Sequence, residues 1–130
     1  MQTRTTGRGA FALAAFAALL VVFARPLTAH HGWGGYVDQL SDISGTTESS
    51  LSLAGPHASL KLKDADGRVW NVLLAPPAGT ERAGLKDGMI PAGAQVVVHG
   101  QRHRDPKTLE IKTTRLTWNG KTYNVYPGRD

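Results

Sequence analysis

Apolar and polar side chains alternate with a period of two over residues 43–53, which is the pattern of a half-buried β-strand. Ile43, Leu51 and Leu53 fall on one face of this segment, and the even positions are all polar. Gly45 would allow so long a strand to bend sharply. The pattern therefore predicts a long, bent first strand.

The same alternation predicts five more strands, and one short helix lies between two of them. The turn 64–67 ends in glycine and joins the second and third strands into a hairpin. Thr80 is expected to cap the helix. The apolar phase shifts at Thr113-Thr114, which indicates a bulge in the fifth strand. The predicted elements are strands over 57–63, 68–74, 94–100, 109–118 and 121–126, and a helix over 81–86.

This order of elements predicts an all-β fold: a small OB-like (oligonucleotide/oligosaccharide-binding) barrel of five to six strands with one short helix between strands three and four. A β-sandwich is the alternative. Closing the sheet hides most strand edges, which a small domain without disulfides needs. The expected organisation is a signal peptide over 1–29, a glycine- and aromatic-rich arm over 30–42 that is not a strand, and the barrel domain over 43–126.

The beginning of the chain has the composition of a secretory signal. A positive, polar stretch is followed by an uninterrupted apolar run over 10–24, then by Pro26 and the small residue Ala29. A retained membrane anchor is the alternative, but a span needs about 20 apolar residues and Arg25 ends this run earlier. We expect cleavage after Ala29 and a periplasmic or secreted mature protein, with no membrane attachment after the signal is removed.

The positive net charge belongs mostly to this leader. The chain has 15 Lys and Arg against 10 Asp and Glu, but three of the arginines lie in residues 1–29, which leaves 12 against 10 in the rest. A nearly neutral domain lacks the electrostatic footprint expected for phosphate backbones, so nucleic acid is excluded as a partner at this level. The absence of cysteine excludes a disulfide scaffold, a thiol nucleophile and a thiolate metal site.

No spacing of Ser, His, Asp or Glu matches a nucleophile elbow, a paired-acid site or a phosphate-binding glycine loop. We therefore expect no enzymatic activity and no catalytic residues. Trp70 and Trp118 lie in the core phase of their strands, so packing is their expected role. Trp33 and Tyr36 are expected to cover an open end of the barrel or to stack on a ligand.

The histidines suggest a metal site. Cleavage after Ala29 would make His30 the first residue, with an α-amine whose ordinary pKa is about 7.7–8.0, so that a metal can displace its proton near neutral pH. The amine and the imidazole of His30 can then chelate one ion. One more imidazole, from His31, His57 or His103, would complete a nitrogen-rich site suited to Cu(II), with Zn(II) or Ni(II) as alternatives. A flexible, solvated arm is the competing interpretation.

Two of these histidines also have ordinary explanations. His57 follows Pro56 on the face opposite the core, where it either binds a ligand or holds a backbone carbonyl beside the turn. His103 lies between Arg102 and Arg104 in a basic loop. Such a loop is either simply solvated or attracts an anion or the acidic patch of a partner.

Several short motifs resemble a family of small bacterial periplasmic proteins of unknown function. Two departures from the family pattern are Gly55, where Asn is usual, and Gly32-Trp33 after the histidine pair. The resemblance implies export and a small β-barrel, and it implies no activity. The matching segments are Ala29-His30-His31, Ser44-Gly45-Thr46-Thr47, Gly55-Pro56-His57-Ala58, Asp64-Ala65-Asp66-Gly67 and the stretch 91–100.

Two functions are consistent with these features. The first is an exported, non-enzymatic binding module for Cu(II), built on His30 with His31, His57 and His103. The second is a structural or interaction module that docks an envelope protein or polymer without metal. Copper is the only cofactor expected, and only under the first hypothesis.

Overall fold

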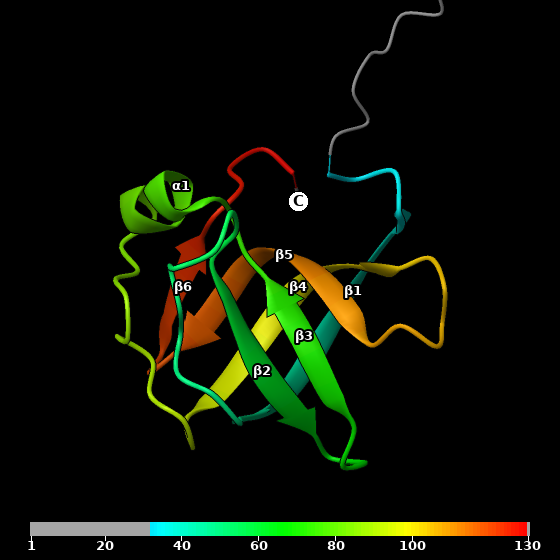
Figure 1. The fold of residues 1–130 in the computed structure, drawn as a ribbon, viewed down its shortest axis with the longest axis horizontal. Coiled ribbons are helices and arrows are strands. Elements are labelled where there is room, and N and C mark those ends of the chain that lie inside the picture. Colours follow the sequence, from blue (N-terminus) through cyan, green and yellow to red (C-terminus); the bar gives the residue numbers. More distant parts are fainter. Residues whose placement is uncertain (1–31, 130) are drawn as a thin grey trace, which may run out of the picture. The chain divides into compact units, whose positions relative to one another are not determined.

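A computed structural model describes residues 32–129, and the expected signal peptide over 1–29 lies outside these residues. Figure 1 shows strands that wrap around one core, with a short helix beside them. The elements are β1 (Tyr36–Thr47), β2 (Ser59–Asp64), β3 (Val69–Leu73), α1 (Pro77–Arg82), β4 (Gln95–His103), β5 (Glu110–Trp118) and β6 (Lys121–Asn124).

The sheet closes on itself. Its strand order is β3-β2-β1-β4-β5-β6, and β3 pairs in addition with β5. This last pairing is parallel and joins Val72 to Ile111, whereas the other pairings are antiparallel. Strands β1 to β5 therefore form a closed five-stranded barrel, β6 extends β5 as an extra hairpin strand, and α1 lies between β3 and β4 in sequence. The predicted OB-like barrel is confirmed.

The first strand begins earlier than the sequence pattern predicted. β1 starts at Tyr36, so part of the segment expected to be an irregular arm is a strand. Its residues from Leu40 to Thr46 pair with β4, and the backbone hydrogen bonds to this partner strand stabilise a strand that the local sequence pattern does not indicate. The same strand ends at Thr47, although Leu51 remains buried in the core beyond it.

The helix also differs from its prediction. It covers Pro77–Arg82 rather than 81–86, with proline in its first turn, because proline has the φ angle that a helix start requires and needs no hydrogen bond there. Thr80 is not the cap. It lies inside the helix, fully buried, and its hydroxyl donates to the carbonyl of Ala75 at 2.9 Å.

The predicted bulge in β5 is confirmed. His99 pairs with Arg115 and Gly100 pairs with Thr113, so that Thr114 is the extra residue. The core is the interior of the barrel and contains the inward side chains of all five strands, among them Ile43, Leu60, Leu62, Trp70, Val72, Val96, Val98, Ile111 and Leu116. Among the described residues, no helix is long and apolar enough to cross a bilayer.

Candidate functional site: a cationic groove beside Trp70

A groove of about 370 Å³ opens on the barrel where the start of β3 faces the end of β4 and the loop that follows it. We call it the Trp70 groove. No carboxylate lines it, and its volume falls in the range of small-ligand sites. Its lining consists of three arginines, one histidine and apolar or hydroxyl side chains: Val37, Arg68, Trp70, Arg102, His103, Arg104, Pro106, Thr108 and Leu109.

Arg102 occupies a position that the strand pattern reserves for core residues. Val96, Val98 and Gly100 are the buried positions of β4, and Arg102 is the next residue in that phase. Its guanidinium carbon lies 5.1 Å from the centre of the Trp70 ring. Its Nε atom is buried and has no hydrogen-bond partner, and no ion pair joins Arg102 to a carboxylate within residues 32–129.

Such an arginine is costly for the fold. A buried donor without an acceptor loses its hydration without compensation, at a typical cost of about 1–3 kcal/mol and more when the group is charged. Unpaired buried polar groups in native structures call for a specific explanation. Arg68 is already paired with Asp64 and Asp66, so an anion that enters the groove would meet the guanidinium groups of Arg102 and Arg104.

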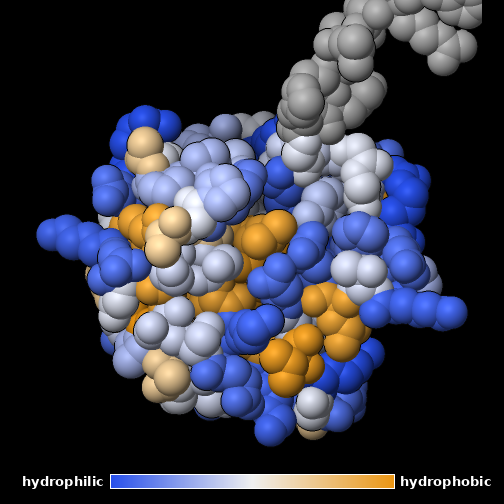
Figure 2. Space-filling model, viewed as in Figure 1, coloured by the Kyte–Doolittle hydropathy of each residue, from blue (hydrophilic) through white to orange (hydrophobic). Residues whose placement is uncertain are grey.

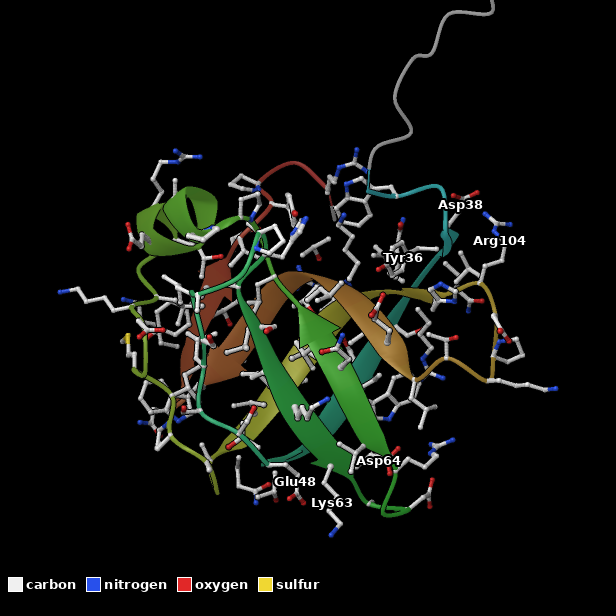
Figure 3. All side chains as sticks on the ribbon, in the orientation of Figure 1. Tyr36, Asp38, Glu48, Lys63, Asp64 and Arg104 are labelled. Carbon is white, nitrogen blue, oxygen red and sulfur yellow. The ribbon has the colours of Figure 1, made fainter. Side chains whose placement is uncertain are left out.

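The other side of the Trp70 ring is organised by one carboxylate. Asp64, at the β2–β3 turn marked in Figure 3, accepts hydrogen bonds from Trp70 Nε1 at 2.9 Å and from Arg68 Nε at 2.8 Å. The hydrogen bond from Trp70 is the largest cause that lowers the pKa of Asp64 to about 2, and the hydrogen bonds and charge of Arg68 act in the same direction. Asp64 thereby fixes the Trp70 ring against which Arg68 and Arg102 lie.

This lowered pKa predicts a specific dependence of stability on pH. A carboxylate whose folded pKa is below its unfolded value stabilises the fold above the unfolded value, and this stabilisation is lost as the pH falls through the folded value. The free energy of unfolding of the native protein should therefore exceed that of Asp64→Asn by its full amount above about pH 4, and this difference should shrink towards pH 2. Urea unfolding at a series of pH values measures it.

Asp66→Asn is the matched control, because Asp66 is a neighbouring turn carboxylate whose side chain is 76% exposed. It should change stability little across the same pH range. A difference between native protein and Asp64→Asn that stays constant down to pH 2 would contradict the assigned role of Asp64.

The loop after β4 supplies the opposite wall of the groove. Two hydrogen bonds fix Arg104 to the start of β1 and the residue before it. Its guanidinium donates to the carbonyl of Tyr36 at 2.9 Å, and its backbone N–H donates to the carbonyl of Gly35. Figure 3 shows Arg104 on this loop, on the side of the barrel that also carries Tyr36. His103 accepts the backbone N–H of Asp105 through Nδ1 at 3.1 Å. The hydrogen bonds of Arg104 therefore hold this loop against β1.

A second cluster fixes the segment in front of β1. Lys112 is 3% exposed, and its ammonium donates a hydrogen bond to the carbonyl of Gly32 and lies 4.7 Å from the centre of the Trp33 ring. Arg129 lies 4.3 Å from the same ring, and Tyr126 meets it edge-on. Burial lowers the pKa of Lys112, with Arg129 acting in the same direction and Glu110 opposing. Trp33 is thus a packing residue of the arm.

Tyr36 is likewise committed to internal contacts. It is 8% exposed, and its hydroxyl donates to Glu110 Oε1, while Asn71 donates to Glu110 Oε2 at 2.9 Å. Burial and the hydrogen bond to Glu110 raise the pKa of the Tyr36 hydroxyl. Trp33 and Tyr36 were expected either to cover an open end of the barrel or to stack on a ligand. The contacts of both residues are those of packing residues.

The predicted metal ligands are only partly within the described residues. His57 Nδ1 contacts the carbonyl of Leu74 at 2.8 Å, which is the ordinary role weighed for it. The Leu74 carbonyl follows the end of β3, whereas His103 lines the groove at the start of β3. Because β3 has five residues at about 3.3 Å each, His57 and His103 lie at opposite ends of this strand. His30 and His31 lie outside the described residues.

No group of three His, Cys, Asp or Glu side chains that could hold a metal occurs within residues 32–129. The four-histidine copper site therefore stays a prediction. The basic residues around His103 are recognisable in the sequence, whereas Arg68 and its position beside Trp70 are not. The available signal was Arg102 itself, a charged residue in phase with three buried positions.

No family model matches the chain, and no curated protein matches it. Among solved structures, the chain is similar to one from the crystal structure of the S. pombe Stn1–Ten1 complex, with 16% sequence identity and a TM-score of 0.47. The match covers 63% of this chain and 59% of that chain, so it spans less than two thirds of the neighbour.

The prediction that excluded nucleic acid as a partner is corrected because of the arginine cluster in the Trp70 groove. The prediction rested on the net charge, which is a sum over the whole mature part. The structure instead gathers Arg68, Arg102 and Arg104 around one groove, and a local cluster of this kind governs binding irrespective of the sum. The exclusion is therefore withdrawn.

Proposed function

We propose that the protein is an exported, non-enzymatic binding module that holds an anionic group of its ligand in the Trp70 groove. The observation that carries this proposal is Arg102, whose buried Nε has no partner in a groove lined by three arginines and no carboxylate. The barrel supplies rigid strands for the site, which is what a preorganised binding site requires. Export is supported by the signal-like composition of residues 1–29.

This proposal develops the interaction-module hypothesis, in which an envelope protein or polymer presents the ligand, rather than the copper hypothesis. The Cu(II) prediction remains separate, and anion binding in the groove does not depend on it.

Titration with inorganic phosphate at constant ionic strength tests the proposal. Calorimetry should show saturable binding, and Arg102→Met should weaken it at least about tenfold, because a hydrogen bond to a charged group contributes roughly 1.5–3 kcal/mol. Arg82→Met is the matched control, since Arg82 is an exposed arginine at the end of α1, outside the lining of the groove. Equal affinities for the two variants, or no saturable binding by the native protein, would refute the proposal.

A further inference from the structure

The Trp70 groove is apolar as well as cationic. Val37, Pro106 and Leu109 line it together with the arginines. Val37 and Leu109 are half-buried and Pro106 is exposed, so part of each side chain is accessible to a ligand. Figure 2 shows hydrophobic surface between hydrophilic side chains on this part of the barrel, near the start of β3 in Figure 1.

The arginines are not spread evenly around the groove. Arg102 lies in the strand phase that continues the core, beside the Trp70 ring, and Arg104 begins the loop that carries Pro106 and Leu109. An adjoining hollow is lined by Asp42, Asp64 and Asp66 together with Arg68, Trp70 and Arg102. Arg104 lines only the Trp70 groove, so negative charge on a ligand is favoured between Arg102 and Arg104, away from these carboxylates.

We infer that the ligand group in the Trp70 groove is a compact amphipathic anion: a phosphate or carboxylate head bound by Arg102 and Arg104, attached to an apolar ring or chain that lies against Val37, Pro106 and Leu109. This inference rests on the proposed function and specifies its ligand class. A groove of about 370 Å³ can enclose a head of this kind together with one six-membered ring, which is consistent with sites for small molecules.

Phenyl phosphate, inorganic phosphate and phenylacetate are the probes. Phenyl phosphate should bind at least about tenfold more tightly than inorganic phosphate, because burying most of one ring face gains roughly 25 cal/mol per Å² of apolar surface. Comparison with phenylacetate shows whether the site prefers a phosphate-ester or a carboxylate head, and either preference supports the inference when phenyl phosphate also binds more tightly than inorganic phosphate.

Val37→Thr tests the apolar wall at nearly constant volume. It should weaken phenyl phosphate several-fold and leave inorganic phosphate unchanged, whereas Val97→Thr, at an exposed valine outside the groove lining, should change neither. Arg102→Met should weaken both ligands.

Failure of this inference is distinguishable from failure of the proposed function. If inorganic phosphate and phenyl phosphate bind equally and both depend on Arg102, the groove is an anion site and the amphipathic ligand class is wrong. If neither binds, both proposals fail. A short single-stranded oligonucleotide that binds more tightly than phenyl phosphate and perturbs residues far beyond the groove would overturn the compact ligand class.

Discussion

Replacing Gly100 with alanine is expected to destabilise the barrel by at least about 3 kcal/mol, because the close approach of two strands leaves no room for a side chain. A Cβ atom on Gly100 would lie 2.1 Å from the carbonyl oxygen of Lys112, which is backbone of β5 and cannot move aside as a flexible side chain could. The position is also where the β4–β5 register shifts. Urea unfolding gives the free energy directly.

The matched control is Gly35→Ala, where the nearest atom to the new Cβ is His103 Nε2 at 3.8 Å, an ordinary contact. It should change the free energy of unfolding by less than about 1 kcal/mol. Gly45 should behave like Gly100, because its Cβ would lie 2.1 Å from the carbonyl oxygen of Lys63. Similar midpoints for the Gly100 and Gly35 variants would show that the strands do not approach as described.

Replacing Trp70 with alanine should cost roughly 3–5 kcal/mol, the typical range for removing a large aromatic side chain from a core. Trp70 is 4% exposed and packs inside the barrel while its Nε1 donates to Asp64. The substitution leaves a cavity, and it also removes the ring beside Arg68 and Arg102. Thermal and urea unfolding should both show the loss.

Two other variants separate packing from hydrogen bonding at this position. Trp70→Phe keeps most of the apolar volume but removes the donor to Asp64, so we expect a smaller loss of about 1–3 kcal/mol. Trp118→Ala removes a half-buried tryptophan at the edge of the core and should cost less than Trp70→Ala. A Trp70→Ala protein as stable as Trp118→Ala would contradict the central place of Trp70 in the fold.

The barrel could be predicted because its determinants are local. The turn 64–67 and the alternation on both sides of it define the β2–β3 hairpin, and the phase shift at Thr113-Thr114 marks the bulge that the structure places at Thr114. The start of β1 could not be predicted, because Tyr36 and Leu40 pair with His103 and Gln101 of β4, which lie more than sixty residues away in the chain.

The candidate site was less accessible to sequence reasoning for a similar reason. Arg68 and Arg102 come from segments that are not neighbours in the barrel, since β5 separates β3 from β4. Only closure of the barrel brings both beside Trp70. The histidine pattern is visible in the linear sequence, whereas an arginine cluster of this kind is formed by tertiary structure.

The most direct test of the account is the Nε–Hε NMR signal of Arg102 during titration with inorganic phosphate. We predict that this signal shifts and saturates, with Arg104 following the same curve, because phosphate bound at the guanidinium changes the surroundings of the buried Nε. The Nε–Hε signal of Arg82, outside the groove lining, should stay in place. If the Arg102 signal does not move while phosphate binds elsewhere on the protein, or if it moves no more than that of Arg82, the Trp70 groove is not an anion-binding site.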